Sequence, residues 1–298
     1  MIQIEKNKRL YKDDDGYMEI THISGHHFSV PSILYKYYPL NKFTVDAITN
    51  HYLYASNPAR LNDRFDCDPQ LVSFKNYDEE LSAIRSLRPG ISIDEEDLYF
   101  TSEFGINYSL VEYYNKHWGI ISLSKVYDDI LMWSHYAKDD GVCIGFYTDR
   151  LPIDWIGPYP VEYVKKREIA YISLQQITLL PLLQCFQKNW KWKYEKEFRF
   201  LINLSKGLSR KTVYDADAIA EIYLGRSFVK HTEINDDEEN FYVTIDKTKR
   251  YDLYRRKILD AIANYNIPVY YDLSLYIDEI HYEPYRLFKK DEVYVFYY

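Results

Sequence analysis

The chain contains few glycines, prolines and cysteines. Its 298 residues include 10 glycines, 11 prolines and 3 cysteines, and none of these is concentrated in one tract. This scarcity of Gly and Pro argues against a long disordered segment. Cys67, Cys143 and Cys185 are far apart and odd in number, which excludes a disulfide framework and a cysteine-based metal site. Free thiols suit a reducing compartment, so we expect a cytoplasmic protein.

Long apolar segments are also missing. The longest apolar run, residues 177–186, is interrupted by Thr, Pro and Gln. A membrane-spanning helix needs about 20 apolar residues, so this run is too short to cross a membrane. Residues 1–6 lack the apolar core of a signal peptide. We therefore expect neither a membrane partner nor a secretion signal.

Several common catalytic motifs are absent. The chain has neither of the two usual glycine-rich phosphate loops, which removes support for nucleotide kinases and dinucleotide dehydrogenases. It has no His-Glu-x-x-His, Cys-x-x-Cys or Gly-x-Ser-x-Gly pattern. A pair of Cys143 with His135 is conceivable, but the apolar surroundings of Cys143 are typical of a buried, inert thiol. We expect no metal site.

Acidic residues outnumber basic ones. With 45 Asp and Glu against 37 Lys and Arg, the formal net charge is −8. General nucleic-acid binding needs clustered positive charge, and short basic stretches such as residues 165–167 are interpreted as loop or helix faces. The 33 tyrosines could stack on bases, but their spread over the whole chain indicates a compositional bias instead.

The order of short apolar segments predicts an α+β fold with a mixed sheet and helical insertions. Residues 1–30 are expected to form a polar, irregular N-terminal extension. Residues 31–298 are expected to form one domain, with a motif core at about 34–225 and an α/β C-terminal part at about 226–298. Strands are predicted at residues 33–38, 52–56, 119–124, 142–146, 161–164, 219–224, 268–271 and 293–297. Helices are predicted at 44–50, 77–117, 130–137, 174–190 and 248–264, with an acidic loop at 236–239.

The most informative segment is residues 192–202. If it is a strand, Glu195, Glu197 and Arg199 share one face and follow one another at roughly 7 Å. Its other face is then aromatic and is formed by Trp192, Tyr194, Phe198 and Phe200. Two interpretations stay open: a carboxylate pair that lines a cleft, or a solvated edge closed by a Glu–Arg pair. In either case we expect a buried aromatic face and a more open charged column.

Five ordered motifs resemble those of a known family. They are Leu-Tyr-Lys-Tyr at 34–37, Leu-Asn-Asp-x-Phe-Asp at 61–66, Trp-Ser-His-Tyr-Ala at 133–137, Gly-Val-Cys-Ile-Gly-Phe at 141–146 and Trp-x-Tyr-Glu-x-Glu-x-Arg at 192–199. Together they resemble a large bacterial family catalogued as a domain of unknown function, some of whose members lie near phage-defence or toxin genes. The resemblance covers about residues 34–225 and implies a role in anti-phage defence or toxicity, without an activity. The chain departs from the family at Arg64, where the family usually has proline, and at Asp139 and Asp140.

The order of strand, helix, strand and a later Glu-x-Glu is also similar to the ADP-ribosyltransferase fold. That similarity implies an enzyme that uses NAD and cleaves its nicotinamide–ribose bond. It would place Lys36 and Tyr37 of the first strand and Ser56, at the end of the second, against NAD. Glu195 and Glu197 would be the catalytic pair. The first strand lacks the arginine that the Glu-x-Glu subclass normally has there.

The implied chemistry follows from the bond that breaks. Its cleavage develops an oxocarbenium-like cation, which a nearby carboxylate stabilises. By this resemblance Glu197 would bond the ribose 2′-hydroxyl, and Glu195 would orient or deprotonate the acceptor. Tyr37 would stack on a ring of NAD, and Lys36 or Arg199 would contact the pyrophosphate. The sequence does not indicate which macromolecule, if any, is the acceptor.

Two other functions stay open. One is a non-catalytic module that binds or senses a nucleotide-like ligand, with a pocket framed by Asn62, Asp63, Trp133 and Tyr136. The other is a Mg²⁺-dependent nuclease, with metal ligands from Asp63, Asp66, Glu195 and Glu197. The four pocket residues also have structural explanations, because Asx side chains close loops and rings at i and i+3 pack in cores. If the motifs build one site, a common cavity should collect Tyr37, Ser56, Asn62 or Asp63, Trp133 and Glu197.

Overall fold

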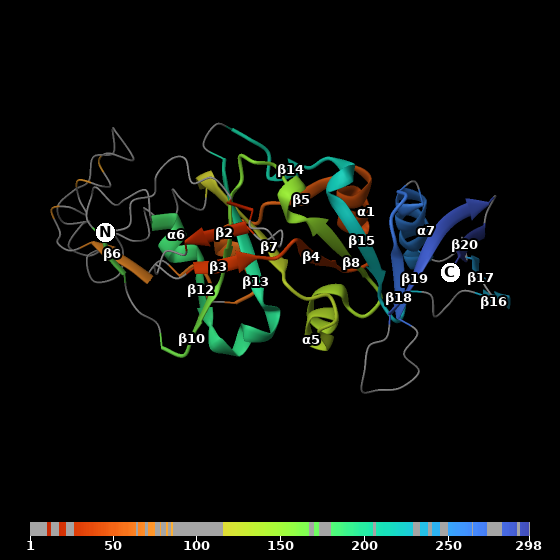
Figure 1. Cartoon of the computed structure of the whole chain (residues 1–298). Coiled ribbons are helices and arrows are strands. Elements are labelled where there is room, and N and C mark those ends of the chain that lie inside the picture. The colour runs from red at the N-terminus through yellow and green to blue at the C-terminus, as the bar shows by residue number, and fades with distance from the viewer. Residues whose placement is uncertain are drawn as a thin grey trace.

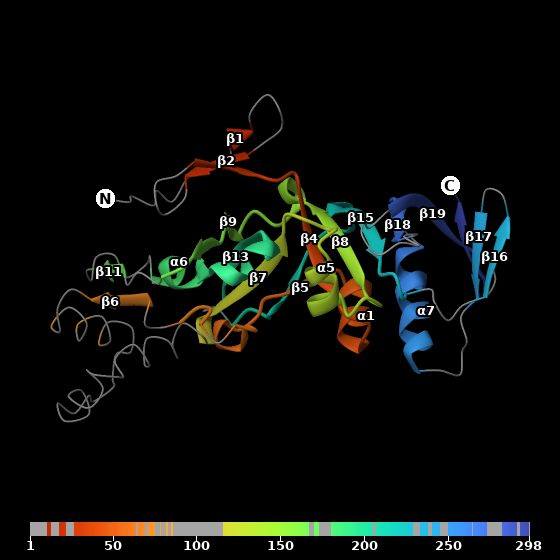
Figure 2. The ribbon, with the colours of Figure 1, turned by 90° about the horizontal axis from the view of Figure 1, so that it is seen from below.

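The described strands and helices form an elongated array (Figures 1 and 2). The computed structural model describes residues 11–12, 18–21, 27–63, 65–68, 71–74, 78, 82, 85, 116–166, 170–172, 180–204, 207–228, 233–237, 240–244, 250–263, 265–272, 282–290 and 293–297. The C-terminal elements lie at one end, and the strands β6 (Val72–Phe74) and β11 (Ala170–Ile172) lie at the other. Within these residues, no helix combines the length and the apolar character needed to cross a membrane.

Eleven strands form one mixed, mostly antiparallel sheet. In sheet order they are β16 (Glu233–Asp237), β17 (Asn240–Thr244), β20 (Val293–Tyr297), β19 (Tyr282–Lys290), β18 (Val269–Asp272), β15 (Ile219–Leu224), β8 (Val142–Tyr147), β4 (Ile33–Tyr38), β7 (Trp118–Ser124), β13 (Glu197–Asn203) and β9 (Ile156–Pro160). The pair β15–β18 is parallel. This sheet, with its helices, confirms the predicted α+β fold.

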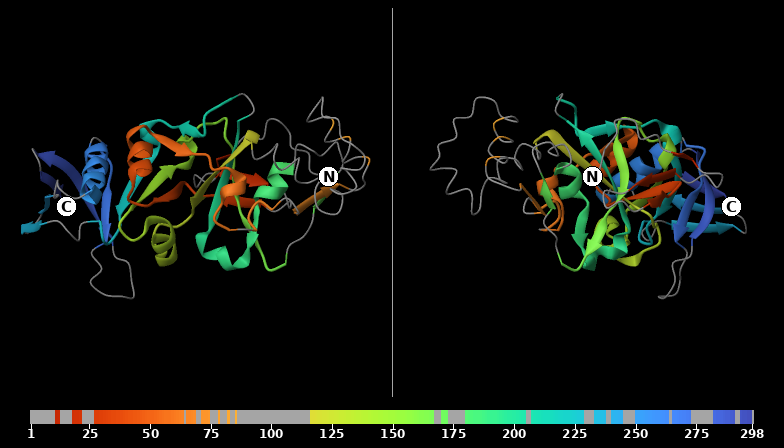
Figure 3. Two further views of the ribbon diagram at one scale, coloured as in Figure 1. Left: turned by 180° about the vertical axis from the view of Figure 1, so that it is seen from behind. Right: turned by 60° about the vertical axis from the view of Figure 1, so that its left-hand side comes forward.

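The middle strands of the sheet are buried on both faces. In β8, Ile144 and Phe146 belong to one core, whereas Cys143 belongs to a second core on the opposite face. The helices α1 (Lys42–Thr49) and α7 (Arg250–Ile262) cover the first face. The short helix α5 (Ile130–Met132) and the π-helical turn η3 (Trp133–Ala137) cover the second (Figure 3). Continuous apolar segments are expected for strands buried in this way.

The sheet opens between β4 and β7. Strand β4 pairs with β8 along its whole length but with β7 only through Tyr35 and Ser124. Strand β7 then pairs with β13 along its whole length, so that Ser124 lies opposite Glu197. The two halves of the sheet therefore diverge from the Tyr35–Ser124 pair. Two functional motifs, on β4 and β13, lie on opposite sides of this opening.

Smaller elements surround the large sheet. Additional strand pairs are β1 (Tyr11–Lys12), β2 (Met18–Thr21) and β3 (His27–Val30) in one sheet, β10 (Glu162–Val164) with β12 (Gln187–Asn189), β11 with β6, and β14 (Lys211–Val213) with β5 (Tyr52–Tyr54). Further helical segments are η1 (Pro58–Arg60), η4 (Thr148–Arg150), α6 (Leu180–Cys185), η6 (Trp190–Glu195) and η7 (Ala216–Ala218). Strand β12 and the 3₁₀ helix η6 lie directly before β13 in the sequence.

The two helices α1 and α5 begin at capping residues. The side chain of Asn41 accepts hydrogen bonds from the backbone of Phe43 and Thr44 and so begins α1. Asp129 does the same for α5, where its side chain accepts from Leu131 and Met132. Such caps satisfy amide groups that lack partners inside the helix. They explain why the helices predicted at 44–50 and 130–137 are confirmed.

One prediction is wrong in its first half. The segment 192–202 is not one strand, because η6 occupies its start and β13 begins at Glu197. Asn189 caps η6 by accepting from the amide of Lys191, and Lys196 ends it with a φ of 42°. The amide of Glu197 then donates to the hydroxyl of Tyr163, 2.9 Å away. Local capping and one tertiary contact thus override the alternating pattern.

Other predicted boundaries also change. The helix expected at 174–190 is α6 followed by β12. Of the acidic loop expected at 236–239, residues 236 and 237 belong to strand β16, and the other two lie outside the described residues. The N-terminal segment contains strands β1 to β3 and is not irregular throughout. Most of the helical region expected at 77–117 lies outside the described residues.

Candidate functional site

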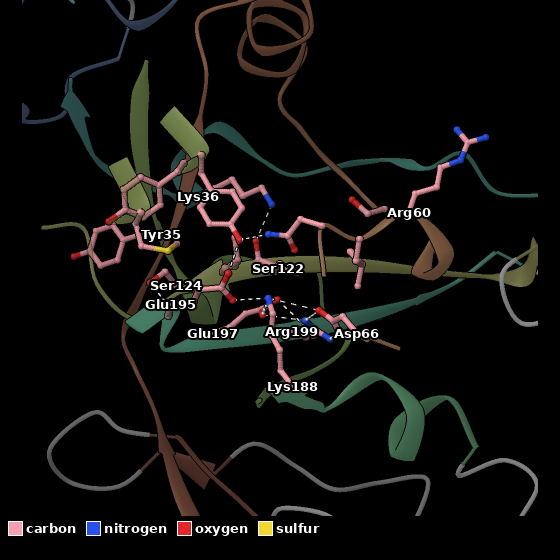
Figure 4. A pocket seen from close by; sticks show the side chains of 17 residues that line it. Tyr35, Lys36, Arg60, Asp66, Ser122, Ser124, Lys188, Glu195, Glu197 and Arg199 are labelled. Carbon is pink, nitrogen blue, oxygen red and sulfur yellow. Dashed lines mark hydrogen bonds and ion pairs between the residues drawn. The ribbon is translucent and has the colours of Figure 1, made fainter. Parts of the chain in front are cut away.

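A cavity of about 210 Å³ lies where the sheet opens between β4 and β7. Its walls come from β4, β7 and β13, and from β12, η6, η3 and the loop 56–66 (Figure 4). Tyr35 and Tyr37 of β4, Ser122 and Ser124 of β7 and Glu197 of β13 line it. Motifs that are far apart in the sequence therefore meet at one cavity.

Arg199 is the centre of a buried ion network. Its Nε and Nη2 donate to the Glu197 carboxylate at 2.7 and 2.9 Å. Its Nη1 and Nη2 donate to the Asp66 carboxylate at 2.7 and 2.5 Å. Nη1 also donates to the carbonyl of Cys185 at 2.6 Å. A guanidinium has five N–H groups, so the protein itself uses all of those on Arg199.

Lys188 lies among three carboxylates. Its Nζ is 2.5 Å from Glu195 Oε2, 3.2 Å from Glu197 Oε2 and 3.5 Å from Asp66 Oδ2. Asp66 and Glu197 also bind Arg199, whereas Glu195 shares only Lys188 with this network. All five side chains are buried. Three carboxylates therefore face two cations, and Glu195 is the carboxylate with the weakest compensation.

This arrangement separates the pKa values of the two glutamates. Burial, and then the negative charge of Glu197, raise the pKa of Glu195 to about 7. Burial alone would raise the pKa of Glu197 as well, but Arg199 and Lys188 hold it well below its ordinary value. Burial alone would lower the pKa of Lys188, yet Glu197 and Glu195 keep it above its ordinary value. Two carboxyl groups with pKa values pushed apart are typical of acid–base sites.

Tyr136 connects Glu195 with the Leu-Asn-Asp loop. Its hydroxyl donates to Glu195 Oε1 and accepts a hydrogen bond from Asn62 Nδ2 at 2.5 Å. Burial, and then Glu195, raise the pKa of Tyr136, so the phenol stays protonated near neutral pH. The cap at Asp129 and the π-helical turn η3 bring Tyr136 to this position.

Lys36 and Arg60 bring further positive charge to the cavity wall. Lys36 Nζ donates to the backbone carbonyl of Ser122 at 2.8 Å, and an ammonium has three donors. Burial lowers the pKa of Lys36, although Glu197 and Glu195 act in the opposite direction. Arg60 is exposed at the end of η1 and also lines the cavity (Figure 4). Both cations can offer donors to an anionic group of a ligand.

The structure brings most of the predicted site residues to this cavity. Those that line it are Lys36, Tyr37, Ser56, Asn62, Tyr136, Glu195, Glu197 and Arg199. Trp133 and Asp63 are not among its lining residues. Trp133 packs edge-to-face on Tyr37, and its Nε1 donates to the carbonyl of Tyr127. Asp63 Oδ1 accepts from the amide of Phe65, which is the loop-closing role that Asx residues commonly have.

Two expectations about these residues need correction. Glu195, Glu197 and Arg199 do not form an open column, because their exposed fractions are 2, 6 and 0%. The reason is that β12 and the loop at Asp66 cover this part of the sheet and supply the opposite charges. Arg199 therefore has no donor left for a pyrophosphate.

Tyr37 is also placed differently from the expectation. Its hydroxyl donates to the carbonyl of Val126 at 2.9 Å, and its ring packs against Trp133. Only 6% of the residue is exposed. The ring can contribute an edge to the cavity but is not free for face-to-face stacking on a ligand.

Several residues that line the cavity were not predicted from the sequence. Lys188 and Arg60 belong to no motif, and Ser122 and Ser124 read only as the polar end of a strand. Asp66 ends the motif at 61–66 but was given a role only as a ligand for Mg²⁺. The alternation of small polar with apolar residues in β7 is the one local signal that could have placed the serines on an inner face.

The carboxylates are not arranged for a metal ion. Within the described part of the chain, no group of three or more His, Cys, Asp or Glu side chains could hold one. Lys188 already lies within 3.5 Å of carboxylate oxygens of Asp66, Glu195 and Glu197. Its ammonium occupies the position that a cation would take between them. This geometry gives the nuclease hypothesis little support.

Replacing Tyr136 by phenylalanine should raise the pKa of Glu195 further. The change removes one donor to the carboxylate, and a hydrogen bond to a charged group contributes about 1.5–3 kcal/mol. Since one pKa unit corresponds to about 1.4 kcal/mol, we expect a rise of roughly one to two units. The measurement is an NMR titration of the ¹³C-labelled carboxyl of Glu195. Tyr52→Phe is the control, because its hydroxyl bonds Asp46 away from the cavity. An unchanged midpoint in Tyr136→Phe would remove Tyr136 from the account of Glu195.

Comparisons with known proteins support one of the two resemblances. No curated protein and no solved structure matches this chain. The similarity to ADP-ribosyltransferases therefore stays a prediction. The resemblance to an uncharacterised family is confirmed over the segment that contains η3, β8, η6 and the first half of β13. Residues 132–200 match the family described as "Protein of unknown function (DUF2971)".

Proposed function

We propose that the cavity is the active site of an enzyme that binds NAD, breaks the nicotinamide–ribose bond and passes ADP-ribose to an acceptor or to water. The main support is the pair Glu195 and Glu197, whose pKa values differ strongly at the wall of an accessible cavity. Groups that differ in this way can divide proton transfer and charge stabilisation between them. The reaction needs both.

Glu195 is suited to act as the general base. Its oxygens accept from Tyr136 and Lys188, which hold the carboxylate in one orientation. A carboxylate has about four acceptor sites, so Glu195 can still take a proton from a nucleophile. A pKa near 7 suits proton transfer at neutral pH. Glu197, which stays ionised, contributes fixed negative charge near the ribose.

The carboxylates of the network favour a cationic transition state. With Glu195 ionised, three carboxylates surround Lys188 and Arg199, and Lys36 on the cavity wall balances the third negative charge. An oxocarbenium-like ribose beside Glu197 would be stabilised by this carboxylate in a poorly solvated site, where electrostatic stabilisation is strong. In this proposal Arg199 keeps the carboxylates in place and does not touch the substrate.

The size of the cavity sets how NAD would bind. At about 210 Å³ it is smaller than the roughly 300–1,000 Å³ of pockets that enclose a drug-sized ligand. We infer that only the nicotinamide and its ribose enter. The pyrophosphate would then lie nearer the rim, where Lys36 and Arg60 offer donors. Arg60 thus replaces Arg199 as the candidate pyrophosphate ligand.

A second candidate is a binding or sensing module without chemistry. The observation in its favour is the complete use of the Arg199 donors, which is also what a purely structural ion network would show. In that case the cavity would bind a nucleotide-like ligand and report it by a change in conformation. Both candidates bind a nucleotide-like ligand, but only the enzyme converts it to products.

Incubation of the full chain with NAD tests both candidates. We expect released nicotinamide, measured by chromatography, and a higher unfolding temperature in the presence of NAD, since a ligand stabilises the state it binds. A thermal shift without nicotinamide would support the binding module instead. The absence of both signals, with or without a macromolecular extract as acceptor, would contradict NAD as the ligand. A role as a defence or toxin effector predicts in addition that expression lowers cellular NAD.

A further inference from the structure

The 3₁₀-helical segment η6 places aromatic and basic side chains alternately on the surface beside the cavity. Its sequence is Trp-Lys-Trp-Lys-Tyr-Glu, from Trp190 to Glu195. Trp190 is 47% exposed, and Trp192 and Tyr194 are half-buried. The segment lies between β10 and α5, as Figure 1 shows for the lower side of the molecule. Single exposed apolar side chains are ordinary on a protein surface, whereas several rings side by side are typical of an interaction site.

The rings continue from this surface to the wall of the cavity. The ring centroids of Trp192 and Tyr194 are 6.0 Å apart, and those of Tyr194 and His135 are also 6.0 Å apart. His135 is exposed, and its Nδ1 is 2.9 Å from the Tyr194 hydroxyl. The next ring, Tyr136, is 6.4 Å from His135 and bonds Glu195. An aromatic path therefore connects η6 with the catalytic candidate.

Lysines frame the same surface. Lys165 Nζ lies 5.7 Å from the centroid of the Trp190 ring, within the range of a cation–π contact. The amide of Lys125 donates to the carbonyl of Lys196, so these two residues also adjoin η6. Exposed lysines at this surface are Lys125, Lys165, Lys191, Lys193 and Lys196. No ion pair joins any of them to an acidic side chain within the described part of the chain.

The local charge contrasts with that of the whole protein. The chain has a formal net charge of −8. Besides the buried Glu195, the acidic side chains described on the flanking elements are Glu162 of β10 and Asp128 and Asp129 before α5. Asp129 already caps α5 with its carboxylate. Lysines without an ion-pair partner, set between aromatic rings, favour a partner that carries both negative charge and planar groups.

We propose that single-stranded nucleic acid binds to the surface formed by η6, Lys165 and His135. Every base has a π-face that can stack on Trp190 or Trp192, while lysines contact the backbone phosphates. A duplex hides the faces of its bases, and an acidic protein does not offer a planar group beside every negative charge. The inference does not depend on the reaction proposed above. It adds a macromolecule that would pass close to the cavity mouth.

Fluorescence anisotropy tests this with labelled oligonucleotides of about 12 nucleotides, DNA and RNA, a length within the usual site size. Trp190→Ala should weaken binding on the order of ten-fold, because it removes one stacking platform. The matched control is Phe43→Ala, an exposed ring under Lys42 at 5.0 Å on α1, which should bind like the original protein.

The salt dependence separates stacking from charge. Lys191→Gln/Lys193→Gln should lower the slope of log Kd against log salt by about 1.4, at about 0.7 for each lost phosphate contact on a single strand. Lys42→Gln/Lys289→Gln should leave the slope unchanged. The inference is overturned if no oligonucleotide binds at about 50 mM salt, or if both Trp190→Ala and Phe43→Ala bind equally well. Equal binding of a duplex, or of polyglutamate, overturns it as well and assigns the surface to polyanions or acidic proteins.

Discussion

Arg199→Met is expected to lower the free energy of unfolding by about 3–5 kcal/mol, the usual cost of leaving buried charges without a partner. Arg199 is fully buried and gives all five N–H groups to Glu197, Asp66 and the Cys185 carbonyl. Methionine fills a similar volume but leaves two carboxylates whose remaining ion-pair partner in the network is Lys188. Urea unfolding at neutral pH measures the loss.

Two further variants test the origin of that loss. Arg150→Met is the control, since Arg150 is exposed and donates to the backbone carbonyl of Asp217; it should cost at most about 1 kcal/mol. Glu197→Gln should also destabilise the protein, and the double variant with Arg199→Met should lose less than the sum of the two. Equal stability of Arg199→Met and Arg150→Met would show that the network does not stabilise the fold.

The pH dependence of this loss has a definite sign. The folded state holds the pKa of Glu197 well below its ordinary value. Such a group contributes stability above its unfolded pKa, about 4.3, and loses it as the pH falls toward the folded value. The difference between Arg199→Met and the original protein should therefore be largest above about pH 5 and shrink in acid. The same unfolding curves, repeated across pH, provide the measurement.

The elements whose structure follows from their own sequence pattern could be predicted. Strand β8 is apolar along its length because both faces are buried, and α5 begins where Asp129 can cap it. The convergence of the motifs on β4, η3 and β13 could also be predicted. Each motif contains polar residues among apolar ones, and packing in a hydrophobic core would not require them. These elements supply part of the cavity wall.

The rest depends on contacts that the sequence does not show. Residues 190–196 alternate like a strand, and only the Asn189 cap and the positive φ of Lys196 turn them into η6. Lys188 has no local signal, because its role comes from three carboxylates on other elements. Arg199 was predicted to face an open cleft. It is buried instead, and its guanidinium pairs with the carboxylate of Asp66, which is distant in the sequence.

Glu195→Gln is expected to give the largest loss of activity, about 10²–10⁴-fold in kcat/KM for nicotinamide release, the usual contribution of a general base. Glutamine keeps the size of the side chain and its one oxygen can still accept from Tyr136 or from Lys188, but it cannot take a proton. The original enzyme should gain activity as the pH rises and level off above about 7, the pKa of Glu195, because the base must be ionised. The remaining activity of the variant should lack this dependence.

Stability separates this catalytic role from a structural one. Because the fold raises the pKa of Glu195, folding loses stability as the pH rises from the unfolded pKa, about 4.3, through the folded one. At about pH 8 the original protein bears the full cost of an ionised Glu195, and Glu195→Gln removes it. The variant should therefore unfold at the same or a higher temperature, as should the exposed control Glu162→Gln, which keeps full activity. A stable Glu195→Gln protein that releases nicotinamide at the original rate would exclude Glu195 as the base. A variant that loses stability at about pH 8 would instead make Glu195, like Arg199, a part of the structural network.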